Sequence, residues 1–149
     1  HMNVGANVAY GLMIRGINRP EREAAARAAL ALVKLEGYED RRPAQLSGGQ
    51  RQRVAIARAL MLNPRILLLD DCLSAVDTQT DEKIMRGLKS IREGKTNIII
   101  SHRISSVHHA DRIFVLQQGQ IAESGTHEEL LAANGLYFEL AELQKIHEN

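Results

Sequence analysis

The spacing of apolar positions divides the chain into helical and strand segments. Ile84, Leu88 and Ile91 recur at i, i+4 and i+7, which predicts one apolar face of a helix. The segments 66–69 and 97–101 are instead short and continuously apolar at their centres, as buried strands of a parallel sheet are. Helical segments come first and strands that alternate with helices follow, so the pattern predicts a layered α/β core.

Polar residues, glycine and proline place the ends of these elements. Asn18 and Pro20 indicate the start of an Ala- and Leu-rich helix over residues 21–36, and Gly37 is its expected C-cap. Residues 3–12 mix apolar and polar positions with no clear period. The other expected elements are a helix at 47–61, a short helical stretch at 104–109, a strand at 112–116, a hairpin turn at Gln118-Gly119 into 120–123, a helix opened by a capping box at Thr126–Glu129, and a last helix at 136–146.

A Ser-Gly-Gly turn opens the helix at 47–61. Ser47 and Gln50 have the spacing of a capping box, which marks the helix start. Gly48 and Gly49 leave the backbone N–H groups uncovered by side chains, and the helix N-terminus adds partial positive charge at the same place. The turn therefore predicts a phosphate-binding surface.

Acidic and histidine side chains follow the two apolar strands. Asp70 and Asp71 end the first strand, Ser74–Asp77 form the next loop with Asp77 as the expected N-cap of a helix, and His102 comes just after the second strand. Ligands of open α/β sheets bind at the carboxyl ends of the strands. We therefore expect Asp70, Asp71 and His102 to converge on one site.

These features, in this order, resemble the ABC ATPases, the ATP-hydrolysing subunits of ABC transporters. The resemblance covers nearly the whole chain. It implies an α/β fold in which a helical subdomain precedes the C-terminal part of a RecA-like P-loop NTPase core with a mainly parallel sheet. The implied division is a cloning scar at 1–2, a helical signature subdomain at 3–60 and the core segment at 61–149.

The resemblance also assigns roles to single residues. Asp70 takes the place of the Walker B aspartate, which supports Mg²⁺ through water, and Asp71 stands where the family has the glutamate that polarises the attacking water. His102 matches the switch histidine that contacts the γ-phosphate. The residues implied to contact ATP, from the signature motif that faces the opposite subunit's nucleotide and from the D-loop at the dimer interface, are Leu46, Ser47, Gly48, Gly49, Gln50 and Asp77.

The sequence departs from the family pattern in two ways. It holds no Gly-x-x-x-x-Gly-Lys-Ser/Thr motif; Gly94-Lys95-Thr96 comes nearest, but Lys89 occupies the first glycine position and a strand follows it, so we interpret it as a helix-to-strand turn. Asp71 in place of Glu withdraws the carboxylate by about 1.5 Å, and a misplacement of that order can cost about a hundredfold in rate. Asp at this position resembles the degenerate subunit of heterodimeric exporters.

Two parts of the chain resemble different branches of the family. Residues 7–12 and Arg41–Pro43 resemble importer-type ATPases, whereas 71–77 and 125–130 resemble exporter-type ones. A fusion of two family members, with a seam between Gln50 and Asp71, is a hypothesis.

Composition narrows the classes of function further. A net charge of +1 gives no electrostatic basis for binding nucleic acid. One cysteine, Cys72, is typical of a reducing compartment, and no apolar run approaches the roughly 20 residues of a membrane-spanning helix. His108, His109 and His127 lack ligand spacing, so no metal site is expected from them. We expect the chain in the cytoplasm, at the cytoplasmic face of the membrane in the intact transporter.

The sequence therefore predicts a fragment of an ABC transporter ATPase subunit. Its partners would be a second nucleotide-binding domain and transmembrane domains, its cofactors ATP and Mg²⁺, and its activity in the intact protein ATP hydrolysis that drives transport. Alone, without a P-loop, it should bind ATP weakly and hydrolyse it negligibly. The alternative is a non-catalytic folded fragment or an engineered chimera that forms homo-oligomers through open strand edges; an ABC ATPase without a transporter role is a third possibility.

Overall fold

A computed structural model describes residues 2–148, with side chains through Lys145. His1, part of the predicted cloning scar, and Asn149 lie outside the described residues. The chain forms two compact units that meet in sequence between Ile100 and Ser101. The elements of the first unit are α1 (Val4–Ile14), α2 (Arg19–Leu32), the short 3₁₀ helix η1 (Pro43–Gln45), α3 (Gly48–Leu60), β1 (Ile66–Asp70), α4 (Thr78–Ile91) and β2 (Thr96–Ile100). Those of the second are α5 (Ile104–Val107), β3 (Ile113–Gln117), β4 (Gln120–Gly125), α6 (His127–Ala132) and α7 (Leu136–Glu148).

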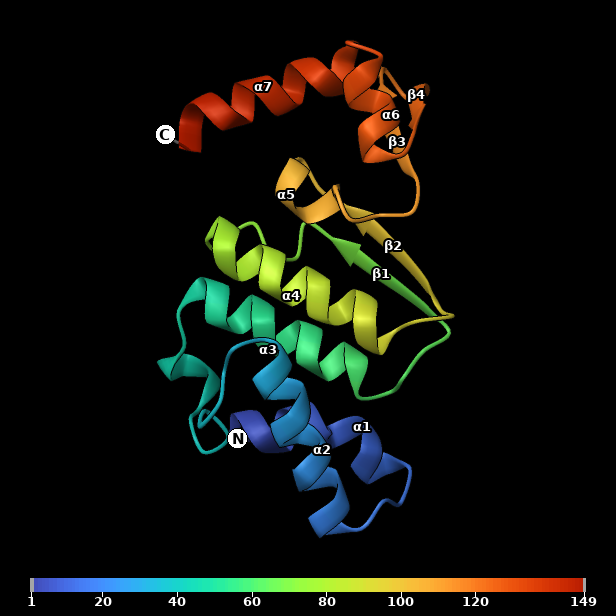
Figure 1. The fold of residues 1–149 in the computed structure, drawn as a ribbon. Coiled ribbons are helices and arrows are strands. Elements are labelled where there is room, and N and C mark those ends of the chain that lie inside the picture. Colours follow the sequence, from blue (N-terminus) through green and yellow to red (C-terminus); the bar gives the residue numbers. More distant parts are fainter. Residues whose placement is uncertain (1, 149) are drawn as a thin grey trace. The chain divides into compact units, whose positions relative to one another are not determined.

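The first unit is built around a parallel strand pair. β1 and β2 pair in register from Ile66 opposite Thr96 to Asp70 opposite Ile100, and α4 is the helix that connects them. Figure 1 shows α4 running alongside the two strands. One aliphatic core joins residues of α1, α2, α3, α4 and β1, so the helices that precede the sheet belong to the same unit as the sheet. The predicted α/β fold with a parallel sheet is confirmed.

The β1–β2 sheet buries one of its faces in this unit. Leu67 and Leu69 are buried, whereas Ile66 and Leu68 are 62% and 59% exposed. The sequence predicted strands that are apolar and buried on both faces. The burial alternates because the helices of this unit that pack on the strands cover the face of Leu67 and Leu69.

Two helices of this unit differ from the sequence-based expectation. Residues 3–12 showed no period, yet Val4–Ile14 form α1, in which the Asn3 side chain accepts a hydrogen bond from the Ala6 N–H at 2.8 Å. This helix is apolar around most of its circumference, so it has no stripe to detect. α2 ends at Leu32, before the predicted Glu36. The left-handed residue Lys34, at φ 58°, ends it, and Gly37 lies in a later turn.

The second unit packs a hairpin against helices. β3 and β4 are antiparallel, and Gln118 and Gly119 have φ of 51° and 77°, which are the positive values of a type I′ turn. α6 begins at the predicted Thr126–Glu129 capping box. Leu130 and Tyr137 of the helices bury their side chains against the hairpin. The predicted hairpin and capping box are confirmed. Among the described residues, no helix is long and apolar enough to cross a membrane.

Candidate functional site

The first turn of α3 carries the predicted capping box. The Ser47 hydroxyl accepts from the Gln50 N–H at 3.3 Å, and the Gln50 side-chain oxygen accepts from the Ser47 N–H at 2.9 Å. Leu46 is buried just before the turn. Ser47 and Gly48 are exposed, and a Cβ added at Gly48 would meet no atom within 4 Å. The capping box uses the N–H groups of Ser47 and Gln50, and an anion can approach the turn at Gly48, where no side chain is in the way.

The segment before α3 is fixed to the same turn. The Gln50 side-chain amide donates to the Tyr38 hydroxyl at 3.2 Å, and the Arg41 guanidinium carbon lies 4.0 Å from the centre of the Tyr38 ring. This segment, the connector between α2 and α3, also contacts α1, because the Val4 N–H donates to the Arg41 carbonyl at 2.8 Å. These contacts set the position of the first turn of α3 relative to α1.

Asp70 and Asp71 lie where the sequence predicted them, at the carboxyl end of β1. Asp70 is exposed, and Asp71 is half-buried with its N–H donating to the Ile100 carbonyl at 2.8 Å. Asp71 has a φ of 44°, in the left-handed region that Asp and Asn tolerate better than most other non-glycine residues. Asp70 thus offers an exposed carboxylate at the strand end, a hard oxygen donor of the kind that Mg²⁺ prefers.

The loop after Asp71 leads into α4 and ends in a cap. The Asp77 side chain accepts from the Thr80 N–H at 2.9 Å, so its predicted N-cap role is confirmed. That hydrogen bond lowers the pKa of Asp77. Cys72 is half-buried in this loop, and burial raises the pKa of its thiol to about 11, so the sulfur stays protonated at neutral pH.

The loop also lies directly on the first turn of α3. A Cβ added at Gly49 would come within 2.4 Å of the Ala75 carbonyl oxygen, so only glycine fits there. Gln52, one turn into α3, binds the same loop: its amide donates to the Ser74 hydroxyl and accepts from the Ala75 N–H, both at 3.1 Å. The structure thus brings the first turn of α3 and the Ser74–Asp77 loop together. Sequence reasoning missed Gln52, because its partners lie more than twenty residues further along the chain.

His102 belongs to the second unit and is exposed. Its backbone carbonyl accepts from the Gln144 side chain at 2.7 Å, and the oxygen of the same side chain accepts from the Ile104 N–H at 2.9 Å. These bonds fix the backbone at the position of His102. Asp70 and Asp71 belong to the first unit, so the convergence of the three side chains stays a prediction.

Gly94-Lys95-Thr96 is a helix-to-strand turn, as predicted. Gly94 has a φ of 73°, the Lys95 N–H donates to the Arg92 carbonyl at 3.0 Å, and Thr96 begins β2. The Lys95 ammonium contacts the Asn63 side chain. Lys95 therefore lies in a turn that precedes a strand, whereas a P-loop lysine lies in a loop that follows a strand and precedes a helix.

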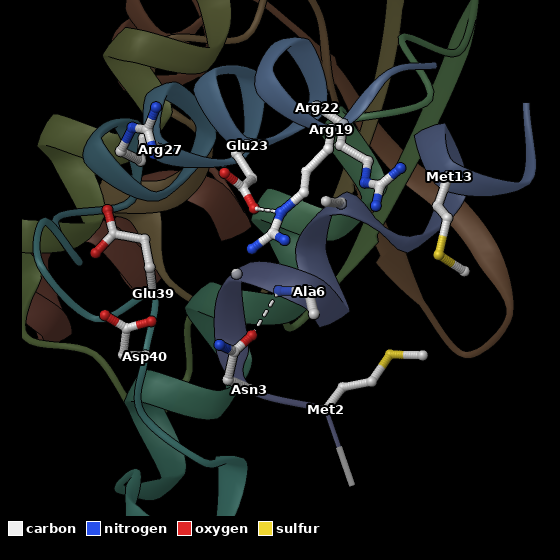
Figure 2. A pocket seen from close by; sticks show the side chains of 12 residues that line it. Met2, Asn3, Ala6, Met13, Arg19, Arg22, Glu23, Arg27, Glu39 and Asp40 are labelled. Carbon is white, nitrogen blue, oxygen red and sulfur yellow. Dashed lines mark hydrogen bonds and ion pairs between the residues drawn. The ribbon is translucent and has the colours of Figure 1, made fainter. Parts of the chain in front are cut away.

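A hollow of about 590 Å³ lies elsewhere in the first unit, between α1, α2 and the connector (Figure 2). Arg19 and Glu23 form an ion pair at 2.7 Å on its wall, and Arg27, Glu39 and Asp40 also line it. Its lining includes none of the residues predicted to contact nucleotide. The charges of both signs on its wall give it no preference for phosphate.

Comparison with known proteins identifies the class of protein that carries this arrangement. The family model for ABC transporters matches residues 1–74. Multidrug resistance protein homolog 65 of Drosophila melanogaster is 44% identical over an alignment of 152 residues, which covers 97% of this chain and 12% of that protein. The ATP-dependent lipid A-core flippase of Chromobacterium violaceum is 45% identical over 148 residues, covering 95% of this chain and 25% of the flippase. A probable multidrug resistance ABC transporter ATP-binding/permease protein of Bacillus subtilis is 54% identical over 112 residues, covering 75% of this chain and 19% of its own length.

Solved structures agree with this classification. A bacterial Atm1-family ABC exporter with ATP bound superposes with a TM-score of 0.78 at 38% identity, covering 96% of this chain and 26% of the exporter chain. A dimeric bacterial ABC transporter cassette gives 0.77 at 37% identity, covering 85% of this chain and 57% of the cassette. The chain belongs to the ABC transporter family, and its fold matches part of the family's ATPase cassette. It spans between 12% and 25% of the length of the three curated relatives named above.

Proposed function

We propose that this chain is the part of an ABC transporter ATPase subunit that supplies the signature side of an ATP site. The observation that carries the proposal is the exposed first turn of α3, in which Ser47 and Gln50 form a capping box and a Cβ at Gly48 would meet no atom within 4 Å. In the intact protein, ATP would be bound and hydrolysed at a dimer interface to drive transport across a membrane. The proposal is supported by the similarity to an exporter with ATP bound and to a dimeric cassette.

The site residues keep the roles that their positions suggest. The backbone N–H groups of Gly48 and Gly49 would bind phosphate, since those of Ser47 and Gln50 already donate within the capping box. The exposed Asp70 carboxylate would support Mg²⁺, which supplies charge neutralisation when bound. Asp71 would orient the attacking water and His102 would contact the γ-phosphate. Leu46 anchors the turn in the core, and Asp77 holds the end of the loop that faces the dimer interface.

The proposed partners follow from the same assignment. They are a second nucleotide-binding domain, which would hold the ATP that this chain's signature turn contacts, and the transmembrane domains of a transporter. The site would then lie at the cytoplasmic face of the membrane. The division into a helical subdomain at 3–60 and a core segment at 61–149 belongs to this proposal.

The test is a titration of ATP-Mg²⁺ into the chain, followed through backbone amide resonances. We expect weak binding that shifts the amides of residues 47–50 first. The variant Gly48→Asp places a negative charge where the phosphate would bind and should abolish the shifts, whereas the uncharged Gly48→Asn should retain them. Unchanged amides at 47–50 in the unmodified chain would contradict the proposal. ATP turnover well above a protein-free control, abolished by His102→Ala, would contradict the expectation that the chain alone is inactive.

A second candidate function is a non-catalytic folded fragment or an engineered chimera that associates with copies of itself. The observation in its favour is the apolar face of the β1–β2 sheet, where Ile98 and Ile100 are 48% and 51% exposed beside the exposed Ile66 and Leu68. The two candidates differ in one simple measurement. ATP-Mg²⁺ raises the thermal midpoint only if the folded chain binds it.

A further inference from the structure

Gln52 joins two parts of the candidate site that the sequence keeps apart. It lies in α3, half-buried, and both ends of its side-chain amide are engaged with consecutive residues of one loop. Its nitrogen donates to the Ser74 hydroxyl and its oxygen accepts from the Ala75 N–H, both at 3.1 Å. An amide that donates to one residue and accepts from the next fixes both the position and the direction of the loop.

The backbone of the same loop also packs against Gly49. A Cβ at Gly49 would lie 2.4 Å from the Ala75 carbonyl oxygen and 3.6 Å from a methyl carbon of Val76. Val76 and Leu73 are buried in the core of the first unit, so the loop has apolar anchors on either side of Ala75. Ala75 itself is exposed, and its N–H donates to Gln52 of α3, while the next N–H, of Val76, donates to the Leu73 carbonyl at 3.0 Å within the loop.

The loop connects two chemically important positions. It begins at Asp71, whose N–H is bound to Ile100, and ends at Asp77, which caps α4. Between them it touches the turn that carries the phosphate-facing N–H groups. A shift of that turn therefore has to move the loop, unless the bonds of Gln52 break first.

We propose that Gln52 is a positioning residue: its bonds to Ser74 and Ala75 lock the Ser74–Val76 segment onto the first turn of α3, so that the phosphate-facing turn and the loop after Asp71 move as one body. The inference rests on the proposed function only where it concerns phosphate; the lock itself exists without a ligand. Gln52 acts through the loop and makes no contact with nucleotide.

The lock is tested first without nucleotide, by hydrogen exchange of the Ala75 amide. Gln52→Met keeps the length of the side chain and removes both bonds, and it should speed exchange about tenfold, as expected for the loss of one hydrogen bond. Gln52→Glu still accepts from the Ala75 N–H, and the Ser74 hydroxyl can turn to donate to it, so exchange should stay slow. Gln79→Met makes the same chemical change at an exposed position of α4 and should leave Ala75 unaffected.

A second measurement tests the coupling to phosphate. On addition of ATP-Mg²⁺, the Ala75 resonance should shift together with Gly48 in the unmodified chain and in Gln52→Glu. In Gln52→Met, Gly48 should still shift and Ala75 should not. A general loss of structure would move both residues, so this split separates positioning from stability.

Several results would contradict the proposed role of Gln52 in holding the Ser74–Val76 segment against α3. Unchanged exchange at Ala75 in Gln52→Met would do so, as would Gln52→Glu behaving like Gln52→Met. If Gln52→Met fails to fold, Ser74→Ala removes one of the two bonds on the surface of the loop, and its Ala75 exchange should rise less than tenfold but measurably; no rise would count against the lock. If ATP shifts no amide at 47–50, the proposed function fails, while slow exchange of Ala75 that depends on Gln52 still supports the lock.

Discussion

At the scale of single residues, Gly48 and Gly49 are neighbours with different requirements. Both lie in the first turn of α3, and both were expected to expose backbone N–H groups to phosphate. The space around them differs: nothing lies within 4 Å of a Cβ at Gly48, whereas a Cβ at Gly49 would collide with the Ala75 carbonyl. The space at Gly48 therefore tolerates a side chain, whereas glycine is required at Gly49 for packing against the loop.

This difference predicts opposite effects of the same substitution. Gly48→Ala should leave stability unchanged or raise it by up to about 1 kcal/mol, because alanine favours helix and meets no neighbour. Gly49→Ala should lower stability by about 1–3 kcal/mol, because the loop backbone must move. Urea denaturation of the two variants measures both values. Equal stability of the two would show that the loop does not press on Gly49.

The reactivity of the Cys72 thiol tests whether the loop after β1 is buried as the structure shows. Burial raises the pKa of its thiol from 9.0 to about 11, so at pH 8 the folded chain should hold about a hundredfold less thiolate than the unfolded chain. Iodoacetamide should accordingly modify Cys72 far more slowly in buffer than in concentrated urea. The same shift makes the folded state bind the proton more tightly, so stability should fall as the pH rises from 9 towards 11. Rapid modification of Cys72 in buffer would show that its thiol is exposed to solvent in the folded chain and would contradict the raised pKa.

At the scale of elements, the caps decide where the helices begin. The capping boxes at Ser47 and Thr126 and the single cap at Asp77 were predicted from sequence, because each depends on residues three positions apart. The sequence pattern did not predict α1, because this helix lacks an apolar stripe. A pattern of neighbouring residues also has no access to contacts between distant segments. It could not reveal the contact of Gln52 with Ala75, which arises only when two distant segments pack together.

The cap of α4 should make that helix sensitive to acid. The Thr80 N–H lowers the pKa of Asp77 below its ordinary 3.8, so the charged cap stabilises the folded state above that pH and is lost as the pH falls through the lowered pKa. Asp77→Asn keeps a capping oxygen that does not titrate. Urea denaturation between pH 3 and 6 should therefore show a smaller loss of stability in Asp77→Asn than in the unmodified chain. Parallel pH profiles of the two proteins would mean that the acid sensitivity arises elsewhere.

At the scale of the whole molecule, the fold class followed from sequence and the environment of the sheet did not. Alternation of helices with apolar strands was sufficient to predict the parallel pair. The apolar runs carry no information on which layer covers each face, since that depends on elements far away in the chain. As a result, Ile66, Leu68, Ile98 and Ile100 form an exposed aliphatic face in a chain whose composition is that of an ordinary globular protein.

This face predicts self-association of the chain in solution. Monomeric proteins rarely expose contiguous apolar patches above a few hundred Å², and the strands also offer backbone groups at their edges. Sedimentation velocity over a range of concentrations should show a mass that rises above 16.6 kDa.

Leu68→Lys should shift the distribution towards the monomer, because a charge in the centre of the face must be desolvated on association. Ile14→Lys makes the same kind of change at an exposed residue at the end of α1, outside the sheet, and should not. If both variants associate like the unmodified chain, the contact between copies lies on another surface; if the unmodified chain is monomeric throughout, the sheet face does not drive association.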